Sequence, residues 1–190
     1  MADERRLWLI RHAPVARPKG ILHDADAPAD VSDHRALAAL RTRLPPHCAV
    51  YASPARRTLE TATALGLAPL KEPRLREQNF GTWTGRRHAE IESELGAAAY
   101  REFWQKPATN RPPGGESFAD QIARVRAALD DLPAGDVVLI AHSGTVRAAL
   151  AIALEITPEA ALRFVIDPLS LTRVDRLERG WRICNVNSQS

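Results

Sequence analysis

The sequence predicts an α/β fold, a three-layer sandwich in which helices cover both faces of a mostly parallel sheet with an antiparallel edge. Two short apolar runs, 7–10 and 137–141, are typical of strands buried inside a parallel sheet, because β-forming residues fill them and polar residues bound them. Helical patterns alternate with the strand-like runs, which favours a sheet whose strands are joined by helices. We expect residues 1–190 to form a single domain.

Between these two runs, capping and helix-breaking residues mark the ends of the predicted elements. Ser32 or Asp33 can cap the first helix, Pro45 ends it, and Gly66 stops the second helix. The predicted elements are a loop at 13–31, a helix at 32–44, a strand at 49–52, a helix at 55–65 and a strand at 69–72.

The C-terminal part adds three helices and a closing hairpin. The predicted elements are a helix at 117–132, a helix at 144–154, a shorter helix near 158–164, and strands at 169–176 and 181–186. Glu178, Arg179 and Gly180 are typical turn residues between the last two strands, so these strands are expected to form the antiparallel edge.

The segment from about 75 to 116 departs from the alternation of strands and helices. It carries Trp83 and Trp104, two short helical patterns, and a stretch rich in proline and glycine at 111–115. Long irregular segments inside a compact domain are usually functional. We therefore expect an insertion at 75–116 that caps the carboxyl edge of the sheet, with the two tryptophans either lining the site or packing beside it.

Charge and hydropathy exclude several function classes. The net charge is +3, and the basic residues are nearly all arginines spread along the chain, whereas a nucleic-acid surface concentrates them. No apolar run approaches the ~20 residues that cross a bilayer, and the polar N-terminus has no signal-peptide pattern. Cys48 and Cys184 lie outside any CxxC spacing and are expected to be reduced thiols. We expect a cytoplasmic protein that binds neither nucleic acid nor membrane.

The strongest functional signal is a pair of histidines, each at the end of an apolar strand. Arg11 and then His12 come directly after the run 7–10, and His142 comes directly after the run 137–141. Because ligands bind beyond the carboxyl ends of parallel strands, both imidazoles are expected to face one crevice. Histidine acts as a nucleophile or an acid–base group at neutral pH, and Arg11 adds a fixed positive charge that suits a phosphate or carboxylate.

Three further groups are expected at the same edge. Ser143 opens a helix directly after His142, so free backbone N–H groups there favour an anion. Arg57 follows the strand at 49–52, near the start of the next helix, and Glu77 places a carboxylate at the mouth of the insertion. No carboxylates or histidines are clustered at metal-ligand spacing, so we expect that neither a metal nor a cofactor is needed.

Four short motifs occur in a fixed order along nearly the whole chain. They read Arg11-His12-Ala13-Pro14, Ser53-Pro54-Ala55-Arg56-Arg57-Thr58, Leu75-Arg76-Glu77-Gln78-Asn79-Phe80-Gly81-Thr82-Trp83, and His142-Ser143-Gly144-Thr145-Val146-Arg147. Together they resemble the motifs of the histidine phosphatase superfamily, also called the phosphoglycerate mutase-like family. The Pro-Gly-Gly-Glu-Ser stretch at 113–117 is similar to members of its α-ribazole phosphatase-like and broad-specificity phosphatase branch.

The resemblance implies a metal-independent phosphomonoesterase that acts on a small phosphate ester through a phosphohistidine, with α-ribazole phosphate as a candidate substrate. In this interpretation His12 is the nucleophile, Glu77 is the general acid, and His142 is a further catalytic group. The implied phosphate-binding residues are Arg11, Arg57, His142 and Ser143. The resemblance does not indicate the oligomeric state.

Two alternatives remain open on the same fold: a phosphoglycerate mutase-type phosphotransferase and a noncatalytic phosphate-binding regulator. Mutases of the family are generally longer than this chain, which favours the phosphatase. The sequence also departs from the family pattern. Ala13 and Pro14 replace the usual residues after the histidine, and His23 and Asp24 stand in a loop expected near the phosphate. An aspartate there would either repel a dianion or bind a substrate hydroxyl.

Overall fold

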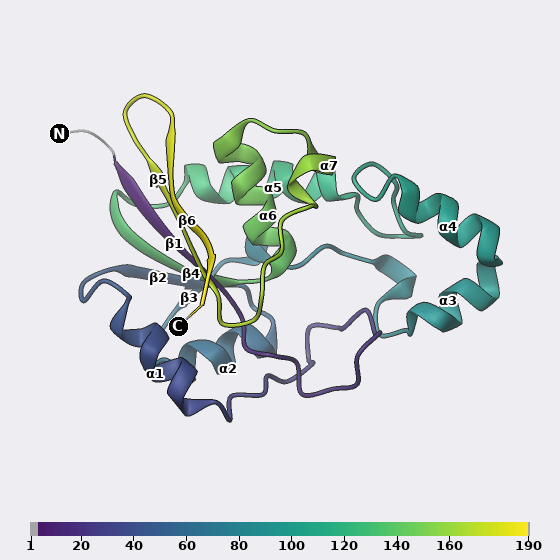
Figure 1. Cartoon of the computed structure of the whole chain (residues 1–190), viewed down its shortest axis with the longest axis horizontal. Helices are drawn as coiled ribbons and strands as arrows, with labels where there is room; N and C mark the ends of the chain where they lie inside the picture. Colours follow the sequence, from purple (N-terminus) through teal and green to yellow (C-terminus); the bar gives the residue numbers. More distant parts are fainter. Residues whose placement is uncertain (1–3, 190) are drawn as a thin grey trace.

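A computed structural model describes residues 4–189 and shows a six-stranded sheet (Figure 1). The strands lie in the order β3-β2-β4-β1-β5-β6. Their bounds are β1 Arg5–Arg11, β2 Ala49–Ala52, β3 Leu70–Lys71, β4 Gly135–Ala141, β5 Leu171–Arg176 and β6 Trp181–Ser188. Strands β1 to β4 are mutually parallel, β5 is antiparallel to its neighbour β1, and β6 is antiparallel to β5. This confirms the predicted sheet with its antiparallel edge.

Successive residues of the central strands point to opposite faces of the sheet, which builds two core layers. Leu9 of β1 enters one layer and Ile10 enters the other. In β4, Leu139 and Ile140 divide in the same way. Helices close both layers, so the predicted three-layer sandwich is confirmed.

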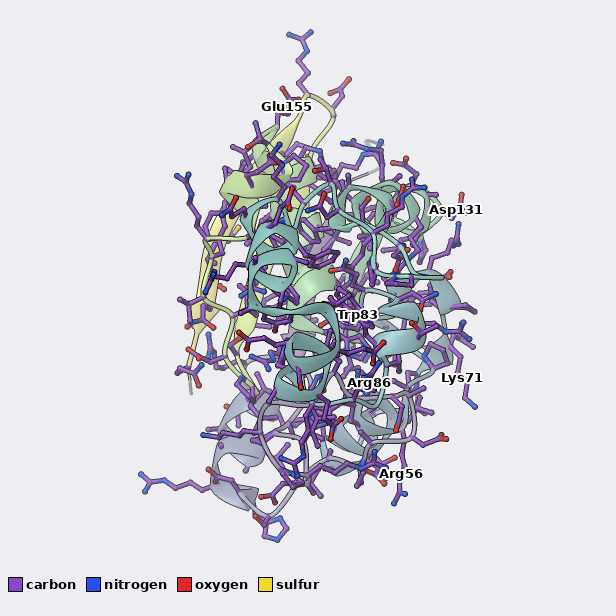
Figure 2. All side chains as sticks on the ribbon, turned by 90° about the vertical axis from the view of Figure 1, so that its right-hand side faces the viewer. Arg56, Lys71, Trp83, Arg86, Asp131 and Glu155 are labelled. Carbon is purple, nitrogen blue, oxygen red and sulfur yellow. The ribbon has the colours of Figure 1, made fainter. Side chains whose placement is uncertain are left out.

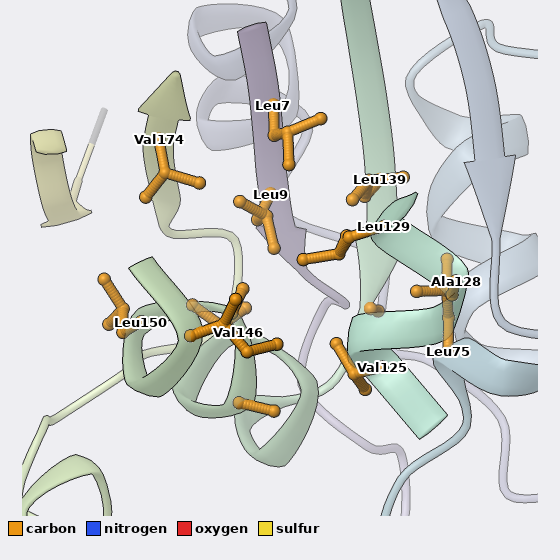
Figure 3. Close-up of a cluster of buried hydrophobic side chains, with 14 of the residues drawn as sticks. Leu7, Leu9, Leu75, Val125, Ala128, Leu129, Leu139, Val146, Leu150 and Val174 are labelled. Carbon is orange, nitrogen blue, oxygen red and sulfur yellow. The ribbon is translucent and has the colours of Figure 1, made fainter. Parts of the chain in front are cut away.

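The layer that contains Leu9 is closed by α5 (Phe118–Asp130) and α6 (Ser143–Leu154). Figure 3 shows Leu129 of α5 and Val146 of α6 close to Leu9 in this layer. All three side chains are buried to within 1% of full burial. Full burial of a leucine contributes about 1.5–3 kcal/mol, so this layer holds α6, and with it the end of β4, in a fixed position.

The opposite face is closed by α1 (His34–Thr42) and α2 (Arg56–Ala64). Asp33, one of the two predicted caps, accepts a hydrogen bond from the Ala36 N–H at 2.9 Å and so starts α1. Leu40 of α1 is fully buried against the sheet. The packing of this face fixes the start of α2 at the carboxyl edge of the sheet.

The insertion, residues 75–116, projects from one side of the sandwich (Figure 1). It and the turn before it contain the 3-10 helices η1 (Pro73–Leu75) and η2 (Gly81–Trp83) and the helices α3 (His88–Leu95) and α4 (Ala97–Gln105). Trp83 is buried with Leu22 and Ile91 in a small separate core. Figure 2 faces this side of the molecule and shows Trp83 near its middle. Trp83 therefore packs the insertion onto the loop that follows β1.

Two predicted elements are shorter than expected. The strand expected at 69–72 is only β3, because Pro69 and Pro73 have no N–H to donate to a ladder. The helix expected near 158–164 is the single turn α7 (Pro158–Ala161), which Thr157 caps. No helix within residues 4–189 is both long and apolar enough to cross a membrane.

Candidate active site

Strand register brings three polar residues to one edge of the sheet. The last residues of β1, β2 and β4 lie close to one another in the ladder, so His12, Ser53 and His142 leave the sheet side by side. The N–H groups of His12 and Ser53 each donate to a carbonyl oxygen of β4 at 3.0 Å. The two imidazole centroids are 5.2 Å apart. The two histidines therefore lie side by side at this edge. His142 lines a neighbouring pocket and His12 does not, so the expectation that both face one crevice stays a prediction.

Arg57, in the first turn of α2, bridges the two histidines. Its Nε–H donates to His12 Nε2 at 3.3 Å, and its Nη2 contacts His142 Nδ1 at 3.2 Å. Its Nη1–H donates to the backbone carbonyl oxygen of Asp24 at 2.7 Å. Arg57 as a whole is only 5% exposed, so its charge acts on both rings at close range with little screening by water.

These contacts determine which nitrogen of each ring carries the proton. Arginine only donates hydrogen bonds, so the nitrogens that face Arg57 accept. The opposite nitrogen of His12, Nδ1, donates to the Ala13 carbonyl oxygen at 2.6 Å, and His142 Nε2 donates to Ser53 Oγ at 2.8 Å. His12 Nε2 therefore carries a lone pair.

Both rings are neutral at pH 7 in the ligand-free site. Burial, with the nearby charges of His142 and Arg57, holds the pKa of His12 well below its usual value. Burial and the charge of Arg57 lower the pKa of His142 in the same way. A neutral imidazole with a free lone pair is the form that a nucleophilic histidine needs.

The buried neutral rings predict a loss of stability in mild acid. In the unfolded chain each histidine gains a proton near its ordinary pKa of about 6.5, whereas the folded ring does not. Unfolding therefore takes up protons. The free energy of unfolding has its full value above about pH 6.5 and decreases as the pH is lowered further. Each ring contributes a slope of about 1.4 kcal/mol per pH unit. Urea unfolding between neutral pH and about pH 5 measures this slope, before most carboxylates titrate.

The variant His12→Gln separates the contribution of one ring from that of the rest. The free energy of unfolding of this variant should depend less steeply on pH, by the uptake of about one proton, because a glutamine does not titrate. His23 and His88 also have lowered pKa values, mainly through burial, and add a background that both proteins share. Equal slopes in the wild type and the variant would show that His12 takes up its proton in the folded state as well.

Glu77 lies where the insertion meets the start of α6. Its Oε1 accepts from Gln78 N–H at 3.1 Å and from Gln121 Nε2 at 3.2 Å. Its Oε2 accepts from Ser143 Oγ at 3.4 Å and from Gly144 N–H at 3.3 Å. The carboxylate is therefore held against the N-terminus of α6, where the helix dipole favours negative charge.

The closeness of Glu77 to α6 explains why a glycine stands at position 144. A Cβ atom on Gly144 would lie 2.1 Å from Glu77 Oε1 and 2.8 Å from Gln121 Oε1. Atoms cannot approach so closely, so any larger residue at 144 would displace the carboxylate. The glycine is needed for this approach and not for an unusual backbone angle, since its φ is not positive.

Arg11 and Ser143 lie beside the histidines in the chain, but their side chains donate hydrogen bonds to other groups. Arg11 Nη1–H donates to the Ile166 carbonyl oxygen at 2.5 Å, and its buried Nε has no hydrogen-bond partner within residues 4–189. The Ser143 hydroxyl faces Glu77 at 3.4 Å. Arg11 thus retains an unused donor, whereas the Ser143 hydroxyl already has an acceptor.

A pocket of about 580 Å³ borders this cluster at Ser53, Glu77 and His142, whereas the buried His12 and Arg57 are not part of its wall. The strand ends contribute Ser53 and His142, and the insertion contributes Glu77, Asn79 and Thr84. In the part of the chain that the structure describes, no three His, Cys, Asp or Glu side chains are grouped so that they could hold a metal ion. That no metal is needed stays a prediction.

The model of the histidine phosphatase superfamily, branch 1, matches residues 7–189. The chain belongs to the histidine phosphatase superfamily. The resemblance carried by the four motifs is thereby confirmed, and so is the prediction of a phosphoric monoester hydrolase of this family.

Two relatives by sequence are named for phosphoglycerate chemistry. A probable phosphoglycerate mutase of Yersinia enterocolitica is 32% identical over 93% of this chain and 87% of its own length. A glucosyl-3-phosphoglycerate phosphatase of Mycobacterium tuberculosis is 34% identical over 80% of this chain and 76% of its own length. Because the probable mutase aligns over most of both chains, length does not separate the two activities among these histidine phosphatases.

Solved structures of histidine phosphatases have the same fold. A mycobacterial glucosyl-3-phosphoglycerate phosphatase superposes with a TM-score of 0.81 at 27% identity, covering 98% of this chain and 100% of that one. The α-ribazole phosphatase of Shigella flexneri superposes with a TM-score of 0.81 at 24% identity, covering 96% of each chain. The second likeness shows the fold alone, and the predicted fold class is confirmed.

The departures from the histidine phosphatase pattern have structural explanations. Ala13 does not adopt a positive φ, so glycine is not required, and its N–H donates to Thr61 Oγ1 at 2.9 Å. The Pro14 carbonyl oxygen accepts from Asp30 N–H at 2.6 Å. The Asp24 carboxylate is paired with Arg17 at 2.9 Å, so its charge is partly neutralised at the edge of the pocket.

Sequence reasoning missed two positioning residues of this histidine phosphatase. Ser53 belongs to the motif at 53–58, but no sequence pattern indicates its hydrogen bond to His142. Gln121 donates to Glu77 and is fully buried in α5, between the buried positions Phe118 and Val125. A polar side chain on the apolar stripe of a helix is a signal that could have identified Gln121.

Proposed function

We propose that this histidine phosphatase hydrolyses a small phosphate monoester by way of a phosphohistidine formed on His12 Nε2. The observation that supports this most is the hydrogen bonding of His12, which leaves the Nε2 lone pair beside a buried cation. The lone pair would attack phosphorus, a P–N bond would form, and the bond to the leaving-group oxygen would break.

Arg57 would stabilise the phosphoryl group during transfer. Its Nε–H now points at His12 Nε2, and an incoming phosphoryl oxygen would take over this hydrogen bond. Arg11 and the N–H groups at the start of α6 would bind the remaining oxygens, and the Ser143 hydroxyl would join them by exchanging its acceptor Glu77 for a phosphoryl oxygen. Because His142 is neutral without ligand, it would add charge only after a bound dianion favours its protonation.

Glu77 would transfer a proton in both steps of the reaction. As a carboxylic acid it would protonate the leaving alkoxide, and as a carboxylate it would then accept a proton from the water that attacks the phosphohistidine. Its four hydrogen-bond donors come from the insertion, α5 and α6, so its position is fixed from three sides. Hydrolysis would return His12 to its starting form.

We further propose that residues 1–190 act as one catalytic domain, with the insertion serving as a cap over the site. The cap supplies Asn79, Thr84 and Glu116 to the pocket, whose volume of about 580 Å³ suits a small phosphate ester better than a polymer or a membrane. The free thiols of Cys48 and Cys184 favour a cytoplasmic location.

A phosphoglycerate mutase-type transfer is the second candidate, because one relative by sequence bears that name. Incubation with 3-phosphoglycerate separates the two reactions. A phosphatase releases inorganic phosphate, whereas a mutase forms 2-phosphoglycerate without net release. α-Ribazole phosphate belongs in the same assay, since its hydrolysis is the activity implied by the branch resemblance.

The phosphohistidine can be trapped directly. A single turnover of p-nitrophenyl phosphate, quenched in alkali to preserve phosphohistidine, should place phosphate on His12 when the peptides are analysed by mass spectrometry. The same experiment in excess chelator should give the same yield, because arginines supply the charge. Phosphate on another residue, or no trapped phosphate in a catalytically active sample, would contradict the proposal. Loss of turnover in chelator, restored by one metal, would contradict metal independence.

A further inference from the structure

The turn that carries Glu77 is tied to α5 by the side chain of Arg124. The Nη1–H groups of Arg124 donate to the carbonyl oxygens of Arg74 at 2.7 Å and Arg76 at 2.9 Å. Its Nη2–H groups donate to the Glu77 carbonyl oxygen at 3.0 Å and to Glu116 Oε1 at 2.6 Å. Its Nε–H donates to Glu116 Oε2 at 3.0 Å. A guanidinium has five N–H groups, so these five contacts use every donor.

This saturation separates Arg124 from the residues proposed to bind phosphate. Arg124 lines the pocket, yet all its N–H groups are already taken by the protein. Arg11, by contrast, has a buried Nε without a partner within residues 4–189. The acceptors of Arg124 lie in the turn at 74–77, where the chain enters the insertion, and at Glu116, where the chain leaves it. Arg124 therefore joins the two ends of the insertion.

The backbone around Glu77 is held more closely than its carboxylate. Arg124 contacts three carbonyl oxygens of the turn at 2.7–3.0 Å, whereas the four donors to the carboxylate lie at 3.1–3.4 Å. The usual range for N–H donors is about 2.7–3.2 Å, so the contacts with the carboxylate are the weaker set. Arg124 extends from a fixed helix, because its neighbour Val125 is fully buried in the layer that contains Leu9. The place of the carboxylate is thus set mainly through the backbone.

We propose that Arg124 is a positioning residue for Glu77, which holds this acid where the leaving-group oxygen must lie. This inference rests on the proposed function. A general acid must lie within hydrogen-bond reach of the atom that it protonates, and a displacement of about 1 Å can lower a rate by roughly 10²-fold. Arg124 has no donor to offer the substrate, so its contribution belongs to the step that needs the proton of Glu77.

A purely electrostatic role is the alternative. After burial and the charge of Arg57, the charge of Arg124 also lowers the pKa of His142. A lysine at 124 would retain the charge, but its three N–H groups share one nitrogen. It could not reach three carbonyl oxygens and both oxygens of Glu116 at once. Arg124→Lys therefore separates positioning from charge.

Single-turnover phosphorylation by glycerol 3-phosphate and by p-nitrophenyl phosphate tests the assignment. Arg124→Gln should slow phosphorylation by glycerol 3-phosphate by roughly 10–100-fold, and by p-nitrophenyl phosphate much less, because nitrophenolate leaves without protonation. Arg124→Lys should show most of the same loss. In the Glu77→Gln background, Arg124→Gln should cause little further loss with glycerol 3-phosphate, because the acid that it positions is already absent.

Arg74→Gln is the matched control. Arg74 lies in the same turn and pairs with Glu72 at 2.7 Å and Asp131 at 2.6 Å, but its side chain does not line the pocket. This variant should lower the unfolding midpoint and leave the ratio of the two phosphorylation rates unchanged. Arg124→Lys keeps a cation beside Glu116 and provides the test if Arg124→Gln does not fold.

The outcomes distinguish this inference from the proposed function. Equal slowing of both esters in the Arg124 variants, no slowing in either, or a full further loss in the Glu77→Gln background would overturn the role of Arg124. Full retention of the wild-type rates in Arg124→Lys would assign its effect to charge and overturn it as well. In each case, phosphate trapped on His12 would uphold the phosphatase function, whereas its absence from the active wild type would overturn both.

Discussion

Replacing His12 by alanine should lower kcat for phosphate monoesters by roughly 10⁴-fold or more, because the covalent pathway loses its nucleophile. His12 is 4% exposed and its Nε2 faces Arg57, so alanine removes the lone pair from this position. Steady-state release of phosphate measures the loss, and the alkaline quench should yield no phosphohistidine. Circular dichroism and the unfolding midpoint establish that the variant is folded.

His47→Ala is the control for this substitution, since His47 is an exposed histidine outside the site. It should retain full activity and the same trapped intermediate. A second test uses His12→Gly, in which imidazole from solution can enter the vacated space and should restore part of the activity. An alanine variant with activity comparable to the wild type would contradict the assignment of the nucleophile.

Replacing Glu77 by glutamine should slow phosphorylation by an alkyl phosphate by roughly 10²–10⁴-fold, the usual size of an acid–base contribution. Glutamine keeps the shape of the side chain but carries no acidic proton. Phosphorylation by p-nitrophenyl phosphate should slow much less, because nitrophenolate leaves without protonation. Single-turnover measurements are needed, because Glu77 is also proposed to assist the attack of water.

Asp24→Asn is the matched control for Glu77→Gln, since Asp24 lines the same pocket but is paired with Arg17. It should change both phosphorylation rates only slightly. Equal slowing of the two esters in Glu77→Gln would indicate that Glu77 positions the substrate and does not donate a proton. The general acid would then be another residue. Glu116 would be a candidate, although it is paired with Arg124.

The elements that carry the site could be predicted because each depends on a local pattern. The apolar runs before His12 and His142 identified two buried strands, and parallel strands share one carboxyl edge. The same rule placed Arg57 near that edge, at the start of α2. The short strand β3 and the single turn α7 were overestimated, because prolines and caps end elements before their apolar patterns do.

The sequence by itself determined which residues reach the site, because strand and helix periodicity, capping residues and motif order are properties of neighbouring positions. Only the tertiary structure decided what their side chains do there. Arg57 bridges both rings, Arg17 pairs with Asp24, and Gly144 leaves room for Glu77, and each of these contacts joins segments far apart in the chain. Side chains choose among such partners by distance and burial, which exist only once the layers have packed.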